Sequence, residues 1–156
     1  MIHKNNISIN FIRYDTTDDF DQPMKRLYEA VVNNVEKSYA PYSKFHVCAC
    51  ALLASGQIVM GHNIENVASP VCICAERTAI SNCIVNHPDD VIEMMAIFAQ
   101  SELYDFRKPV TPCGSCRQVL VEIENKQKHD IKILLCGKDY SLLFASAHEL
   151  LPFAFE

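Results

Sequence analysis

The order of hydrophobic and polar positions predicts a chain of short strands and helices. Residues 45–54 are almost entirely hydrophobic, which indicates a buried strand, and Ser55-Gly56 predicts a hairpin turn into a second strand over residues 58–63. Similar hydrophobic or alternating patterns predict further strands over residues 7–14, 91–99, 131–136 and 141–145.

Helices are predicted between these strands, where hydrophobic residues recur at helical spacing. After Pro23, the series Met24, Leu27, Tyr28, Val31, Val32 and Val35 predicts a helix that ends before Ala40-Pro41. Residues 74–85 and 112–124 predict two more helices, and 147–151 a short one. The order predicts an α/β fold, a sheet of about five strands with helices on its faces and its last strands parallel.

Composition narrows the classes of protein that remain. The 156 residues are 49% hydrophobic, so we expect one domain over 1–156 with residues 1–20 as an N-terminal extension. The four glycines are too scattered for a dinucleotide-binding or phosphate-binding loop. The net charge of −5 argues against non-specific nucleic-acid binding. Without a signal peptide or a membrane-length hydrophobic segment, the expected location is cytoplasmic.

Cysteines carry the most informative chemistry. Cys74 and the pair Cys113 and Cys116 each stand where a predicted helix begins, and a helix N-terminus favours the thiolate that binds metal. Cys113 and Cys116 are three residues apart, so both can face one point, and Cys74 could supply a third ligand. Three protein ligands leave one tetrahedral zinc position open, as in catalytic sites, and Glu76 could transfer the proton of a water there.

These cysteines have two alternative interpretations. A redox C-x-x-C pair would require neither Cys74 nor Glu76. A closed structural zinc site would require a fourth ligand, for which Cys72 is the nearest candidate. The remaining cysteines, Cys48, Cys50, Cys72, Cys83 and Cys136, are interpreted as packing residues. The open catalytic zinc site is favoured because it uses the whole pattern.

The same segments resemble the zinc deaminase signature, and most closely the small, homotetrameric cytidine deaminases with three cysteine ligands. The matching segments, in family order, are APYSKF at 40–45, NIEN at 63–66, CAERTA at 74–79, PCGSCRQV at 112–119 and ELLP at 149–152. The resemblance covers the chain from about Met24 to its end. It implies a three-layer α/β/α cytidine deaminase-like fold and assembly into a homotetramer.

The resemblance also implies roles for individual residues. It makes Cys74, Cys113 and Cys116 the ligands of one zinc ion per chain, Glu76 the catalytic proton shuttle, and Arg77 a donor to the ligand thiolates. It assigns substrate binding to Phe45, Asn63, Glu65, Ala75 and Phe155, the last reaching a neighbouring subunit. The implied reaction is hydrolytic deamination of cytidine and deoxycytidine in pyrimidine salvage, through attack of water on C4 and loss of ammonia.

Three departures from the family pattern concern the substrate more than the zinc chemistry. Cys48 stands where a glycine is usual, and Ser69 where many members have a tyrosine that contacts the ribose. The stretch from Cys74 to Cys113 is several residues longer, with the excess placed around 86–90 or 101–108. A zinc deaminase of another nucleoside, nucleobase or blasticidin-like substrate is therefore the alternative. A nucleic-acid editing deaminase and a non-enzymatic zinc module are further alternatives.

Overall fold

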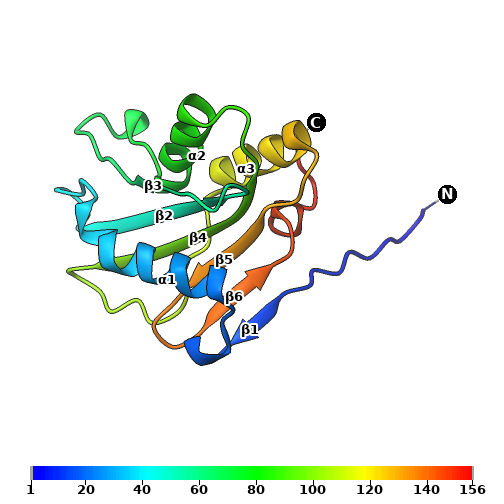
Figure 1. Cartoon of the computed structure of the whole chain (residues 1–156), viewed down its shortest axis with the longest axis horizontal. Helices are drawn as coiled ribbons and strands as arrows, with labels where there is room; N and C mark the ends of the chain where they lie inside the picture. Colours follow the sequence, from blue (N-terminus) through cyan, green and yellow to red (C-terminus); the bar gives the residue numbers. More distant parts are fainter. Residues whose placement is uncertain (1, 156) are drawn as a thin grey trace.

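The computed structural model describes residues 2–155, and its helices and strands form three layers (Figure 1). The strands are β1 (Ile12–Tyr14), β2 (Phe45–Leu53), β3 (Ile58–His62), β4 (Ile92–Ser101), β5 (Lys132–Cys136) and β6 (Ser141–Phe144). The helices are α1 (Gln22–Asn34), α2 (Ala75–Asn86) and α3 (Gly114–Gln127). One mixed sheet in the order β1-β6-β5-β4-β2-β3 has α1 on one face and α2 with α3 on the other. The three-layer α/β/α fold is therefore confirmed.

The direction of the strands also agrees with the prediction. β4 and β5 are parallel and are connected through α3, whereas β2 pairs with both β3 and β4 in the antiparallel sense. β3 and β4 therefore point the same way on either side of β2, and α2 connects them. Because α2 and α3 both follow strands that point the same way, their N-terminal ends lie at the same edge of the sheet.

Strand β2 separates two hydrophobic cores. Ala49, Ala51 and Leu53 face α2 and α3, while Cys48 and Cys50 face α1. All five side chains are fully buried, which follows from the two-residue repeat of a strand in the middle of a covered sheet. The packing role expected for Cys48 and Cys50 is confirmed.

The boundaries differ from the prediction at several ends. The sheet has six strands rather than about five, because residues 12–14 pair with β6 as an edge strand. The predicted strand over 7–14 is only three residues long, since its register with β6 places Phe11 opposite Phe144, where β6 ends, and leaves residues 7–10 no partner in that strand. The short helix predicted at 147–151 is a 3-10 turn over Ala147–Leu150. Within residues 2–155, no helix combines the length and hydrophobicity required to cross a membrane.

Candidate active site

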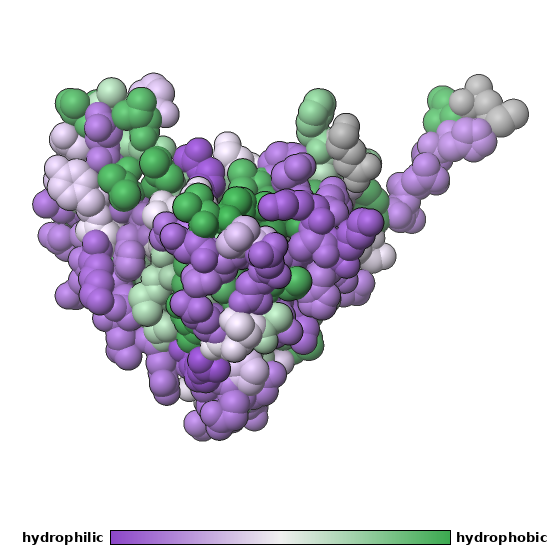
Figure 2. Space-filling model, turned by 45° about the horizontal axis from the view of Figure 1, so that its top comes forward, coloured by the Kyte–Doolittle hydropathy of each residue, from purple (hydrophilic) through white to green (hydrophobic). Residues whose placement is uncertain are grey.

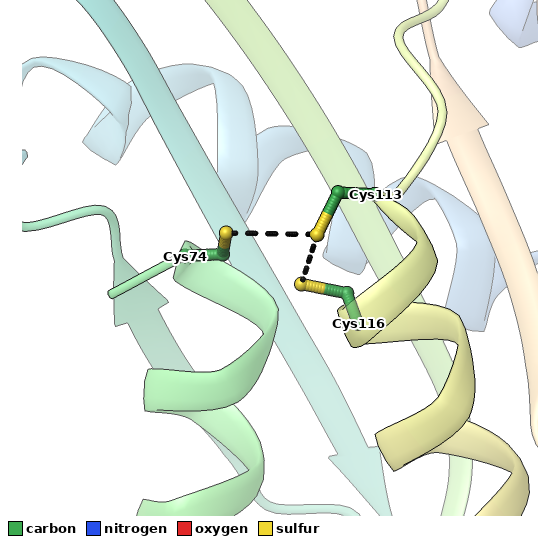
Figure 3. A group of neighbouring side chains, drawn as sticks. All are labelled: Cys74, Cys113 and Cys116. Carbon is green, nitrogen blue, oxygen red and sulfur yellow. Dashed lines mark hydrogen bonds between the residues drawn. The ribbon is translucent and has the colours of Figure 1, made fainter. Parts of the chain in front are cut away.

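Two helix N-termini bring three cysteine sulfurs together. Cys74 is the N-cap residue of α2, Cys113 is the N-cap residue of α3, and Cys116 lies in the first turn of α3. The Sγ atoms of Cys74 and Cys113 are 3.9 Å apart, those of Cys113 and Cys116 are 3.4 Å apart, and all three lie within 4.8 Å of one another. Figure 3 shows the sulfurs converging from the two helices. Helices predicted to begin at Cys74 and Pro112 begin one and two residues later, which leaves Cys74 and Cys113 as caps.

The electrostatics of this cluster favour a thiolate. The pKa of Cys74 is lowered to about 5, chiefly by a hydrogen bond from the Cys116 thiol and further by Arg77 and Cys113. The pKa of Cys116 is raised, because that thiol retains the proton that it shares with Cys74. Three converging sulfurs, one already stabilised as a thiolate, form a donor set that fits Zn²⁺. In the described part of the chain, no other group of three or more His, Cys, Asp or Glu ligand atoms lies as close together.

Glu76 lies beside the three sulfurs, in the first turn of α2. Its side chain is buried, with 5% of the residue exposed. Burial raises the pKa of this carboxyl, and the nearby Cys74 thiolate adds to the effect. A carboxyl whose pKa is moved towards neutrality can both accept and donate a proton under physiological conditions.

Arg77 interacts with the Cys74 side chain and with the backbone just before it. Its Nη2 donates to the Cys72 carbonyl oxygen at 3.2 Å, and its pKa is raised chiefly by interaction with the Cys74 side chain. Within the described residues its buried Nε has no hydrogen-bond partner. An unpartnered buried N–H beside a sulfur cluster is a donor available to thiolates that gain charge.

A pocket of about 360 Å³ opens beside the cluster. It is lined by the predicted site residues Phe45, Asn63, Glu65, Cys74, Ala75, Glu76 and Cys113 and by Val47, Ile64, Ser69, Cys72, Ile73, Ile97, Val110 and Thr111. The structure thus gathers most of the residues singled out in the sequence around one cavity, with polar groups at a few positions among hydrophobic ones. Such a lining is typical of a small-molecule site.

Asn63 is held in place by backbone groups at the start of β2, and Glu65 by backbone groups of the segment that leads into β2. The Asn63 amide accepts a hydrogen bond from Val47 N at 2.7 Å and donates to Phe45 O at 2.9 Å. Glu65 Oε2 accepts from the backbone N–H groups of Tyr42 at 2.9 Å and Ser43 at 3.2 Å. Glu65 Oε1 has no such bond within the described residues, so this rigidly held carboxylate retains an acceptor for a ligand.

Three predicted site residues are not among those that line this pocket: Cys116 and Arg77, which belong to the sulfur cluster beside it, and Phe155, which lies elsewhere. Phe155 is 86% exposed, and its backbone exchanges two hydrogen bonds with the Gln118 side chain on α3. Conversely, Val110 and Thr111 line the pocket but were not predicted from the sequence, and Cys72, predicted to be a packing residue, is half-buried at the pocket. The sequence cue to these three residues is their position, because each lies two or three residues before a proposed metal ligand.

Comparisons with known proteins agree with this geometry. Residues 21–129 match the family model described as the cytidine and deoxycytidylate deaminase zinc-binding region. The cytidine deaminase of Halalkalibacterium halodurans is 34% identical over 129 residues, which cover 83% of this chain and 91% of that protein. The probable cytidine deaminase of Dictyostelium discoideum is 32% identical over 131 residues, covering 84% and 82% of the two chains.

Solved structures give the same result. The crystal structure of cytidine deaminase from Burkholderia pseudomallei aligns with a TM-score of 0.69 at 33% identity, covering 84% of this chain and 98% of that one. The crystal structure of cytidine deaminase from Mycobacterium tuberculosis aligns with a TM-score of 0.67 at 27% identity, covering 87% and 99%. The chain therefore belongs to the cytidine and deoxycytidylate deaminase family, whose model describes a zinc-binding region.

Proposed function

We propose that this protein is a zinc-dependent hydrolase that deaminates cytidine and deoxycytidine to uridine and deoxyuridine with release of ammonia. The observation that carries the proposal is the convergence of three cysteine sulfurs and a buried Glu76 at one end of a pocket that also holds Asn63 and Glu65. Cys74, Cys113 and Cys116 would hold one zinc ion per chain. When bound, zinc supplies the Lewis acidity that lets water attack an aminopyrimidine carbon at neutral pH.

The remaining chemistry belongs to Glu76. Deamination forms a bond from the water oxygen to C4 and breaks the bond from C4 to the amino nitrogen. The Glu76 carboxylate takes one proton of the attacking water and delivers it to ring nitrogen N3. It then passes the proton of the new C4 hydroxyl to the departing amine, so that ammonia leaves and a C4 carbonyl remains. Arg77 offsets the charge of three thiolates by donating towards the sulfurs.

Substrate orientation follows from the walls of the pocket. Asn63 and Glu65 offer donors and acceptors suited to the hydroxyl groups of a sugar. Phe45 offers a flat hydrophobic surface for the pyrimidine ring, and Ala75 leaves space at the reacting end because its side chain is small. Ser69 also lines this pocket and occupies less volume than a tyrosine would.

We include a homotetramer in the proposal, supported by exposed hydrophobic residues beside the pocket. These are Tyr39, Tyr42, Ile64, Val67, Val71 and Ile73, of which Val67 is 84% exposed. Figure 2 shows hydrophobic side chains gathered at one upper corner, on the side where Figure 1 places the segment between β3 and α2. Patches of this kind mark protein interfaces, and a partner chain there would bring its Phe155 within reach of a neighbouring site. Light scattering should give the mass of four chains, and an active monomer would contradict a shared site.

The experiment that tests the reaction is a substrate panel. Zinc-loaded protein is assayed for ammonia release from cytidine, deoxycytidine, adenosine, guanine and blasticidin. Turnover of the two cytidine nucleosides above the others is expected. Turnover of only one of the others would move the function to that substrate. A role in cytoplasmic pyrimidine salvage is the physiological part of the proposal, supported by eight cysteines that are all free thiols.

A further inference from the structure

We infer that Phe106 is a positioning residue that sets the affinity of the pocket by holding the ring of Phe45, an inference that rests on the proposed function. The two ring centroids are 5.3 Å apart and the ring planes meet at 77°, which is an edge-to-face contact. Phe45 lines the pocket, whereas Phe106 lies behind it and is not among the lining residues. Phe106 can therefore reach a substrate only through Phe45.

The segment that carries Phe106 begins beside Phe45. Strand β4 ends at Ser101, which is the register partner of Phe45. The next residue, Glu102, donates its backbone N–H to Lys44 O at 3.1 Å, and its carboxylate lies 3.2 Å from His46 Nε2. The chain therefore leaves the sheet fastened to residues on both sides of Phe45.

The far side of the segment is fastened to the turn between β5 and β6. The Asp105 carboxylate pairs with Lys138 Nζ at 2.5 Å, and the Arg107 guanidinium pairs with Asp139 at 2.5 Å. The Arg107 carbonyl oxygen also accepts the backbone N–H groups of Lys138 and Asp139, at 2.9 and 3.0 Å. Figure 1 shows the segment after β4 passing this turn on its way to α3. Exposed ion pairs are weak singly, but here they act together with backbone bonds.

These two attachments leave Phe106 fixed between them, against the ring of Phe45. Both aromatic residues are half-buried, so neither ring is held by the hydrophobic cores. Without the edge of Phe106, the Phe45 ring would gain rotational freedom that must be lost again when a pyrimidine binds. Cys74, Cys113 and Glu76 line the pocket, whereas Phe106 does not. The effect therefore falls on binding rather than on the chemical step.

The test compares Phe106→Leu with the conservative variant Phe106→Tyr and with the control Tyr104→Leu. Tyr104 lies on the same segment and is 67% exposed; its ring pairs with that of Phe106 at a centroid distance of 6.0 Å but has no aromatic pairing with Phe45. This control therefore tests whether the contact with Phe45 itself is required. For zinc-loaded Phe106→Leu, the Kd for uridine and the KM for cytidine should rise about 3- to 10-fold, as expected for loss of an aromatic pair. Its kcat should stay within about twofold, and Phe106→Tyr and Tyr104→Leu should bind uridine like the wild type.

A double-mutant cycle separates action through Phe45 from an independent effect. If Phe106 acts through Phe45, then adding Phe106→Leu to Phe45→Leu should weaken uridine binding no further. Additive losses, or an unchanged uridine Kd in Phe106→Leu, would overturn the inference. The NMR shifts of the Phe45 ring protons provide a measurement that requires no substrate. They should move in Phe106→Leu and stay in Tyr104→Leu, even if the substrate panel refutes cytidine deamination.

Discussion

Gly61 on β3 lies directly against the backbone of Ala79 on α2. A Cβ atom on Gly61 would be 2.2 Å from Ala79 N and 2.4 Å from Ala75 O. The strand and the helix therefore meet backbone to backbone, with no space for a side chain between them. Cys74 caps α2 and Glu76 lies in its first turn. The contact between Gly61 and Ala79 therefore sets how far those two side chains lie from the sheet.

Replacing Gly61 by alanine should consequently disturb both stability and the metal site. We expect the free energy of unfolding to fall by about 3 kcal/mol or more, since a backbone clash cannot be relieved by a side-chain rotation. Zinc content per chain should fall with it. Urea denaturation and metal analysis measure the two effects. Gly114→Ala is the matched control, because a Cβ there meets nothing within 4 Å. Equal stability of the two variants would contradict the close-contact interpretation.

Glu76→Gln tests the proposed proton transfer. The amide is similar in size and cannot accept a proton from water, so kcat should fall by at least about 10²-fold. Zinc content should remain near one ion per chain, because Glu76 is not a proposed ligand. The rate of ammonia release and metal analysis are measured on the same sample. Turnover close to that of the wild type would show that another group moves the proton.

Replacing one of the three converging cysteines should lower zinc binding, whereas replacing Cys83 should not. Cys116→Ala is expected to lower zinc content well below one ion per chain and to abolish turnover. Cys83→Ala, which removes a buried thiol of α2 that does not face the cluster, should keep both. Treatment with a chelator should inactivate the wild type, and added zinc should restore it. Retention of zinc by Cys116→Ala would show that the ligand set differs.

Arg77 should matter for metal affinity. Its buried Nε has no partner within the described residues and lies where ligand thiolates gain charge. Arg77→Gln is therefore expected to weaken zinc binding about 10- to 100-fold. Competition with a chromogenic chelator measures the change. Arg26→Gln offers a surface control, because among residues 2–155 the Arg26 side chain hydrogen-bonds only to the carbonyl oxygen of Gly56, at 2.9 Å.

The attachment of the segment around Phe106 should depend on pH. The pKa of Asp105 is lowered below its ordinary 3.8, chiefly by the hydrogen bond from Lys138 and also by Arg107. A lowered carboxyl pKa stabilises the folded state at pH values above 3.8, and that contribution is lost as the pH falls through the folded pKa. An NMR titration of the Asp105 carboxyl should show the low value, and Lys138→Gln should raise it. An unchanged Asp105 titration in Lys138→Gln would exclude the pairing.

The hydrophobic pattern was sufficient for the parts of the fold that are buried on both sides. The alternating faces of residues 45–53 and the hydrophobic run of β4 could be predicted, because full burial leaves little choice of conformation. The N-terminal residues 7–11 alternate in the same way and form no strand. A strand depends on a partner, and the end of β6 at Phe144 is a tertiary fact that local pattern does not contain.

The site likewise has one part that the sequence predicts and another that it does not. Cys74, Glu76, Cys113 and Cys116 were predictable because metal chemistry restricts both residue type and spacing. The contact between Phe45 and Phe106 was not, since it joins residues 61 positions apart and Phe106 lies on a segment without regular structure. Nothing local marks Phe106 as different from other aromatic residues of the chain.

The two chain ends are unequal places for an affinity tag. Residues 2–9 are exposed, and the beginning of this segment extends away from the sheet, so a fusion ahead of it stays clear of the fold (Figure 1). The other end is fastened to α3 by Gln118, and Arg117 next to it joins Leu150 O to Pro112 O immediately before Cys113. A fusion at that end would disturb the hydrogen bonds to α3, the helix that carries two of the proposed metal ligands. Expression vectors should therefore carry the tag at the N-terminus, and one without histidines avoids competition for zinc.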